Sequence, residues 1–191
     1  MARPRNDVHD VWLEHKIHLL SRTILLSGPV NEEMKTKVLL AKRMIDAEKQ
    51  TVTVELDTEG GDCYEGISIY DCLRSFKARV EIVGFGKVMS MGIFIMQAAD
   101  PGGRLLMPNS TVMVHQGHSD SPSDHPETLQ RNAKEDRRIR ARMDRIVYER
   151  TKPTASPKLT LKEFVAKHQF DNYYSPVHAI CAGLADRILT P

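Results

Sequence analysis

The segment TVTVELDTEGGDCYEGISIYDCL (residues 51–73) contains two different hydrophobic periods, separated by a pair of glycines. Before the glycines, apolar and polar residues alternate, which is the period of a β-strand. After them, Asp62 and Glu65 have the spacing of a capping box at the start of a helix. The apolar side of that helix is expected to consist of Ile67, Tyr70, Leu73 and Phe76. A strand, a tight turn and a helix in this order indicate an α/β unit.

A second unit of the same kind precedes this one. TILLSGPV (residues 23–30) predicts a strand that ends at Gly28 and Pro29. Asn31 is then a suitable N-cap for a helix. The apolar residues of this helix recur at steps of three and four: Met34, Val38, Ala41 and Ile45.

Three more strands and a buried helix are expected downstream. VEIVGFG (80–86), RLLMP (104–108) and TVMVH (111–115) are short apolar segments typical of strands. SMGIFIMQAA (90–99) is apolar all round, which predicts a buried helix. Because strands alternate with helices, the predicted fold class is α/β with a largely parallel sheet.

The character of the chain changes after His115. Residues 116–126 are polar and rich in turn formers, so we expect a loop there. Residues 127–150 predict a long, highly charged helix with only a thin apolar stripe, which is mostly solvated or projects to meet a partner. TKPTASPK (151–158) ends that helix, and a last helix and a short segment complete the chain.

Composition narrows the class of protein. The 191 residues suit a single domain, and 27 Lys and Arg against 25 Asp and Glu leave a net charge of only +2, too small to argue for nucleic acid or a membrane surface. The cysteines, Cys63, Cys72 and Cys181, form no CxxC pair, which favours a reducing compartment. No apolar run approaches the length of a membrane span, so we expect a soluble, intracellular protein.

Ser90 is the first candidate for chemistry, because a helix start would place its hydroxyl beside free backbone N–H groups. A lone serine at this position is more often an N-cap, and the G-x-S-x-G pattern is absent because Val88 replaces its first glycine. His115, at the end of a strand, is either a base for this serine or a histidine of the core or rim. The other histidines are assigned to loops or charged faces: His9, His15, His18, His118, His125, His168 and His178.

Ligand-binding patterns are weak in this sequence. The glycines Gly60 and Gly61 let the backbone approach a bound group closely, or they form a plain turn. The chain lacks the phosphate-binding pattern GxxxxGK[ST], and HQGH (115–118) has no further ligands at zinc-like spacing. Asp171 is not distinguished from the other acidic residues. The residues alone therefore indicate an α/β protein and a candidate serine hydrolase.

Four blocks together resemble one known family. DTEGGDCYEGISIYDCL, GFGKVMSMGIFIMQAAD, LLMPNSTVMVHQ and FDNYYSPVHAICAGLADRIL occur in the order and spacing of ClpP proteins, the proteolytic subunits of the Clp protease. The resemblance covers roughly residues 10–117 and 140–189. It implies a spiral of ββα units related to the crotonases, with a projecting long helix.

The resemblance also implies an organisation of the chain. It would be one domain over residues 1–191, built from four consecutive segments: an N-terminal segment (1–20), the core (21–115), a loop with a handle-type helix (116–152) and a C-terminal segment that carries the acid (153–191).

Site residues follow from the same resemblance, position by position. Ser90 would be the nucleophile, His115 the general base and later the acid, and Asp171 the carboxylate that orients the imidazole. The backbone N–H groups of Gly61 and Met91 would form the oxyanion hole.

The resemblance further implies a cytoplasmic serine endopeptidase that assembles into seven-membered rings and degrades unfolded polypeptides. An ATP-dependent unfoldase of the AAA+ class would supply the substrate, so no cofactor, metal, nucleic acid or membrane is expected as a ligand of this chain.

Two segments depart from the family pattern. In residues 117–126, prolines and polar residues replace the usual glycine-rich strand, which binds substrate and helps to join the rings. The link from residue 151 to Asp171 is longer than is usual. Two other functions stay open at this point: a crotonase-like acyl-CoA enzyme, and a non-catalytic or partner-dependent ring subunit.

Overall fold

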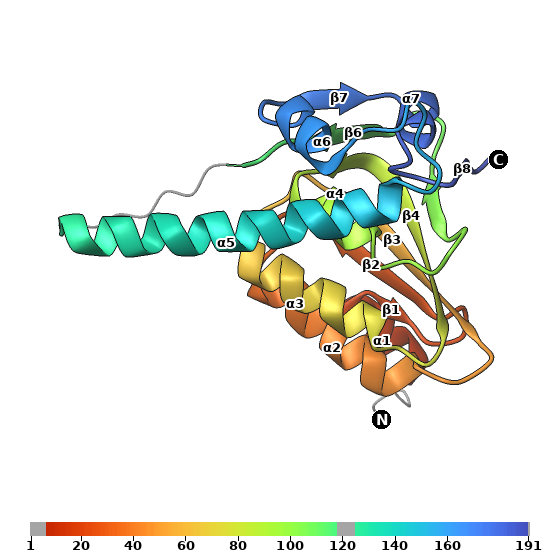
Figure 1. Ribbon diagram of the computed structural model, residues 1–191. Coiled ribbons are helices and arrows are strands. Elements are labelled where there is room, and N and C mark those ends of the chain that lie inside the picture. Colours follow the sequence, from red (N-terminus) through yellow and green to blue (C-terminus); the bar gives the residue numbers. More distant parts are fainter. Residues whose placement is uncertain (1–6, 118–124, 191) are drawn as a thin grey trace.

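The centre of the molecule is a mostly parallel sheet with helices on its faces, as Figure 1 shows. The computed structural model describes residues 7–117 and 125–190, with side chains from residue 11 onward. Within these ranges the sheet has eight strands, and six of them follow the order β1-β2-β3-β4-β5-β8. The α/β class and the mainly parallel sheet are therefore as predicted.

The strands are β1 (Ile17–His18), β2 (Thr23–Ser27), β3 (Thr51–Thr58), β4 (Arg79–Met89), β5 (Arg104–Leu106), β6 (Thr111–Val114), β7 (Asn172–Tyr174) and β8 (Arg187–Ile188). The helices are α1 (Asp7–His15), α2 (Glu32–Ile45), α3 (Cys63–Arg74), α4 (Met91–Met96), α5 (Pro126–Thr151), α6 (Leu161–Lys167) and α7 (Pro176–Cys181). Antiparallel pairing occurs between β1 and β2 and between β6 and β7.

The two predicted strand–helix units form as the sequence indicates. Val52, Val54 and Leu56 of β3 are fully buried between the helices and the neighbouring strands. The side chain of Asn31 accepts a hydrogen bond from the Met34 N–H and caps α2. The residues of α2 that the helical period placed inside are all buried: Met34, Val38, Ala41 and Ile45.

Helix α3 differs in detail from its prediction. Asp62 caps it by accepting bonds from the backbone N–H groups of Tyr64 and Glu65. The carboxylate of Glu65 lies 2.8 Å from Nζ of Lys35 on α2. The predicted capping box would instead have directed it to the backbone N–H of Asp62, the N-cap residue. The buried residues are Gly66, Ile69, Cys72 and Leu73, because α3 is covered by both α2 and α4.

Strand β4 connects two parts of the sheet. Its first half pairs with β5 at Ile82–Gly84, and its second half pairs with β6 at Lys87–Met89. At Gly84, the last residue that pairs with β5, an added Cβ would lie 2.5 Å from a methyl group of Val88 and 2.8 Å from one of Leu106, so a larger residue would displace these side chains. This division carries the end of β4 away from β5 and places it beside β6.

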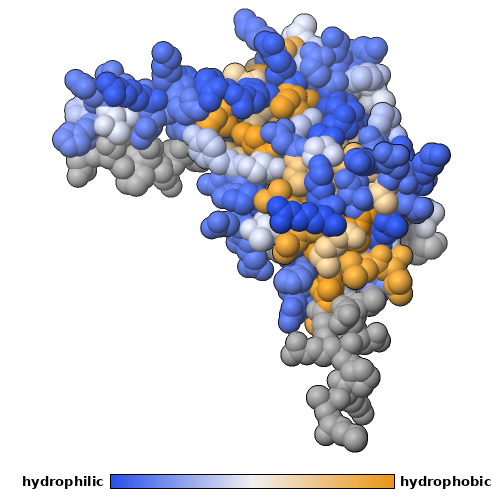
Figure 2. Space-filling view, turned by 90° about the horizontal axis from the view of Figure 1, so that it is seen from below, coloured by the Kyte–Doolittle hydropathy of each residue, from blue (hydrophilic) through white to orange (hydrophobic). Residues whose placement is uncertain are grey.

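Helix α5 runs across the body and projects beyond it (Figure 1). Only Ile139, Val147 and Thr151 of its 26 residues are buried, and hydrophilic side chains cover its projecting part in Figure 2. This matches the thin apolar stripe that the sequence predicted. The preceding loop, predicted over residues 116–126, lies mostly outside the described residues.

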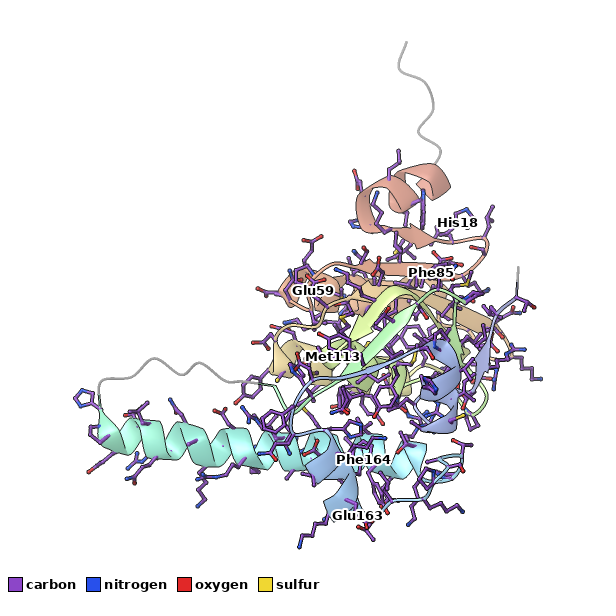
Figure 3. All side chains as sticks on the ribbon, turned by 90° about the horizontal axis from the view of Figure 1, so that it is seen from above. His18, Glu59, Phe85, Met113, Glu163 and Phe164 are labelled. Carbon is purple, nitrogen blue, oxygen red and sulfur yellow. The ribbon has the colours of Figure 1, made fainter. Side chains whose placement is uncertain are left out.

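The C-terminal segment holds more structure than the sequence predicted. One helix and a short segment were expected, whereas α6, β7, α7 and β8 are present. Strand β7 is only three residues long, too short to show a period of two, and its order depends on pairing with β6. Figure 3 shows Phe164 of α6 facing the body and Glu163 lying on the outer side.

A buried arginine attaches this segment to the sheet. Arg104 of β5 is 3% exposed, and its guanidinium donates to the carboxylate of Asp186, to Gln97 Oε1 at 2.8 Å and to the Gly183 carbonyl at 2.7 Å. The backbone N–H of Arg104 also donates to Asp186, at 2.9 Å. Removal of either charge would leave the other buried without its partner.

We therefore expect Asp186→Asn to lower the free energy of unfolding by about 3–5 kcal/mol, because the Arg104 charge stays buried. The control is Glu81→Gln, which removes the exposed ion pair with Arg79 and should cost about 1 kcal/mol or less. Urea denaturation followed by circular dichroism measures both. Equal losses in the two variants would contradict this role of Arg104.

Candidate active site

Ser90 lies at the junction where β4 ends and α4 begins. Its φ of 52° and ψ of −118° are values that residues other than glycine rarely adopt. Two backbone hydrogen bonds hold it there: its N–H donates to the Met113 carbonyl at 2.9 Å, and its carbonyl accepts from the Ile93 N–H at 3.1 Å. The side chain makes no capping bond to α4, so its hydroxyl does not serve as the helix cap.

The hydroxyl of Ser90 is directed at His115. Oγ lies 2.8 Å from His115 Nε2. His115 directly follows β6, and the parallel pairing of Met89 with Met113 fixes the end of β4 against the end of β6. The register of two buried strands therefore determines this contact.

Asp171 reaches the same histidine from the other side. It directly precedes β7, whose Asn172 pairs with Val114 in the antiparallel ladder. Oδ1 of Asp171 lies 2.9 Å from His115 Nδ1. An ionised carboxylate can only accept, so Nδ1 carries the hydrogen and Nε2 is free to accept the hydrogen of the Ser90 hydroxyl.

The three side chains differ in exposure. The His115 side chain is 20% exposed and the Asp171 side chain is 55% exposed, so water reaches the carboxylate end of the hydrogen-bond chain. The serine end is more enclosed, since every residue of α4 is buried behind it. Such a chain of hydroxyl, imidazole and carboxylate can activate a serine as a nucleophile.

The glycine pair lies against Ser90. A Cβ added at Gly60 would be 2.6 Å from Ser90 Cβ and 3.1 Å from both Ser90 Oγ and the Met91 nitrogen. Gly61 and Val30 form an isolated parallel β-bridge. Its two hydrogen bonds run from the Val30 N–H to the Gly60 carbonyl and from the Asp62 N–H to the Val30 carbonyl. The N–H of Gly61 therefore points away from Val30. At Gly61 an added Cβ would lie 2.4 Å from the Val30 carbonyl oxygen.

Met91 is the first residue of α4, and its N–H therefore has no carbonyl partner within the helix. Its side chain is 2% exposed and packs against Gly66 of α3. The glycine pair and the Met91 N–H thus belong to two neighbouring backbone segments beside Ser90. That the N–H groups of Gly61 and Met91 form an oxyanion hole stays a prediction.

His168 is a residue whose role the sequence did not indicate. It was assigned to a loop or a charged face, but it is 3% exposed at the end of α6. Nδ1 donates to the Phe164 carbonyl at 2.9 Å, so Nε2 accepts from the Tyr174 hydroxyl at 2.8 Å. The only local signal is its spacing of four from Phe164, which places it on the buried side of α6.

The His168–Tyr174 bond closes a short loop that contains Asp171. The two bonded residues stand three positions before and three positions after the carboxylate in the chain. Burial lowers the pKa of His168 to about 4, and the charge of Lys167 acts in the same direction. The imidazole therefore stays neutral near pH 7, and this hydrogen-bonding pattern is kept.

Among residues 7–117 and 125–190, no group of three or more His, Cys, Asp and Glu side chains is placed to hold a metal ion. In the same ranges, no helix combines the length and apolar character needed to cross a bilayer.

Gly60→Ala should abolish labelling of Ser90 by a fluorophosphonate, a probe that reacts with activated serine hydroxyls. The new methyl group would collide with Ser90. Gly28→Ala is the matched control, because Gly28 has a similar φ of 92°, against 106° at Gly60, but no atom lies within 4 Å of its added Cβ. Both variants lose stability, on the order of 1 kcal/mol, through the positive φ, but only the first should lose labelling.

A second prediction concerns pH. Unfolded His168 takes up a proton near pH 6.5, whereas the folded residue does so only near pH 4. Its contribution to stability is therefore complete above pH 6.5 and is lost as the pH falls toward 4, by up to about 3 kcal/mol. Urea denaturation of the wild type and His168→Gln at pH 7.5 and pH 4.5 isolates this effect. A difference between the two proteins that does not change with pH would contradict it.

Comparison with known proteins identifies the family of the chain. The family model of the Clp protease matches residues 10–191. The ATP-dependent Clp protease proteolytic subunit of Deinococcus radiodurans is 30% identical over 173 residues, which span 90% of this chain and 81% of that protein. Since the match includes both the sheet and the segment that carries Asp171, the chain belongs to the Clp protease family.

Proposed function

We propose that this protein is a serine endopeptidase, the proteolytic subunit of a Clp-type protease that cleaves unfolded polypeptides. The observation that carries the proposal is the hydrogen-bond chain Ser90–His115–Asp171 in a member of this family. A serine hydroxyl is a weak nucleophile until a base takes its proton, and a neutral imidazole at 2.8 Å is such a base.

In the first half of the reaction, Ser90 Oγ attacks the carbonyl carbon of the peptide bond while His115 Nε2 takes its proton. The negative charge that forms on the carbonyl oxygen is stabilised by the N–H groups of Gly61 and Met91. His115 then gives the proton to the leaving amine, and the acyl group stays on Ser90.

In the second half, His115 takes a proton from water, which attacks the acyl carbon. His115 then returns the proton to Ser90 Oγ as the bond between Oγ and the acyl carbon breaks, and the second product leaves as a carboxylic acid. Asp171 keeps the imidazole in the tautomer with hydrogen on Nδ1 and stabilises the imidazolium that forms twice in the cycle. No step requires a metal or a cofactor.

Assembly and substrate supply belong to the same proposal. The Deinococcus relative is named as ATP-dependent, while this sequence lacks GxxxxGK[ST]. We therefore assign ATP use to a separate AAA+ unfoldase of the Clp type. The chain itself would form heptameric rings in the cytoplasm, with α5 as a contact to neighbouring subunits because so little of it is buried by its own chain.

The two other functions have less support. A crotonase-like acyl-CoA enzyme does not need a serine bonded to a histidine and a carboxylate, and the family model that matches is that of the Clp protease. A non-catalytic subunit does not need the three side chains at 2.8 and 2.9 Å.

The test is fluorophosphonate labelling of the assembled protein, with size-exclusion chromatography of every sample. Ser90→Ala and His115→Ala should lose labelling, and Asp171→Asn should slow it by about 10²-fold or more. Ser68→Ala is the control, since this hydroxyl bonds to the Tyr64 carbonyl of its own helix, and labelling should be unchanged. Labelling that persists in Ser90→Ala, or a ring-sized wild type that does not react, would refute the proposal.

A further inference from the structure

A cavity separate from Ser90 lies between the C-terminal end of α5, the segment that follows it, α6 and α7. Its volume is about 360 Å³, within the range of small-molecule sites. Its walls consist of Tyr148, Thr151, Lys152, Ala155, Ser156, Pro157, Leu159, Phe164, Lys167, His168, Tyr173, Tyr174, His178, Cys181, Ala182 and Leu184. The proposed peptidase chemistry does not use this cavity.

The walls combine an apolar surface with positive charge. Leu159, Phe164 and Leu184 contribute aliphatic and aromatic surface. Two lysines supply the positive charge, and among the described residues the lining contains no Asp or Glu. The charge of the walls therefore favours an anion, and their apolar surface favours a ligand with a hydrophobic body.

The two lysines are held close to the aromatic walls. Nζ of Lys152 lies 5.6 Å from the ring centre of Tyr148, and Nζ of Lys167 lies 5.3 Å from that of Tyr174. Among the described residues, no salt bridge involves either lysine. Their ammonium groups can therefore bind a carboxylate without losing an ion pair within the chain.

We propose that this cavity binds a small carboxylate with an apolar body, such as an aromatic acid. The apolar part would pack on Phe164 and Leu159, and the carboxylate would lie at Lys152 and Lys167.

The cavity also touches the loop that carries Asp171. His168 and Tyr174, which bond to each other at 2.8 Å across that loop, are both wall residues. A ligand packed on this pair changes the freedom of Asp171, and therefore the reactivity of Ser90. This effect rests on the proposed function, whereas the binding itself does not.

The experiment compares 1-naphthoate with its neutral analogue 1-naphthamide by isothermal titration calorimetry on the assembled protein. Wild type and Ser90→Ala should both bind the acid, about tenfold more tightly than the amide, because a charged hydrogen-bonding partner is added. The double variant Lys152→Gln/Lys167→Gln should bind the two compounds equally. Lys158→Gln/Lys162→Gln, with the same change of charge outside the walls, should behave like the wild type.

Cys181 shows where the ligand binds, because it is exposed and lines the cavity. In a Cys63→Ser background, naphthoate should slow alkylation of Cys181 by a maleimide. Naphthoate should also change the rate of fluorophosphonate labelling of Ser90 by a factor of about two or more, and this change should be absent in Lys152→Gln/Lys167→Gln.

Three results would overturn the site: no saturable binding at millimolar acid, equal affinity for acid and amide in the wild type, or no protection of Cys181. Binding with an unchanged rate of Ser90 labelling would overturn the effect on Asp171. If the wild type is not labelled at all, the peptidase proposal fails, and the titration of Ser90→Ala still decides whether the cavity binds the acid.

Discussion

The arrangement of the site depends on strand β6 being paired along both of its edges. On one edge it is parallel to β4, and on the other it is antiparallel to β7. Each of the three strands ends or begins next to a side chain of the hydrogen-bond chain: Ser90 after β4, His115 after β6 and Asp171 before β7. A slip of one residue between β4 and β6 would turn His115 away from Ser90, and a slip between β6 and β7 would turn Asp171 away from His115. The two registers therefore leave a single arrangement.

The two neighbours of β6 hold the site residues in different ways. The β4 side is enclosed by α4, all of whose residues are buried, and it can hold Ser90 at an unfavourable backbone conformation. The β7 side consists of three residues at the edge of the sheet, with an exposed carboxylate before them. On this side, the buried hydrogen bond between His168 and Tyr174 holds the segment that carries Asp171. The serine end is therefore held by packing against α4, and the acid end by one buried polar pair.

Local patterns in the sequence predicted what local physics determines. The alternation of Val52, Val54 and Leu56 and the helical spacing of Met34 and Val38 were sufficient for β3 and α2, because each pattern lies within one element. Ser90 and His115 could be chosen as candidates for the same reason, since both follow apolar strands. Asp171 was found only through the family resemblance. What distinguishes it is the pairing of β6 with β7, in which Val114 lies opposite Asn172, 58 residues later in the chain. The burial of His168 and the ion pair of Glu65 with Lys35 likewise depend on contacts between elements. The hydrophobic period of a single segment does not predict such contacts.

Helix α5 makes the stability of the chain uneven. Its 26 residues extend over about 39 Å, and the buried positions Val147 and Thr151 lie at the end nearest the body. Toward the other end, order rests on helix propensity and on surface pairs such as Glu135 with Arg138, each a small contribution. The outer turns therefore fray and exchange their amide hydrogens without unfolding of the sheet. The ordered length of this helix is therefore not fixed by the core of the chain, and any contact made along its outer turns would lengthen it.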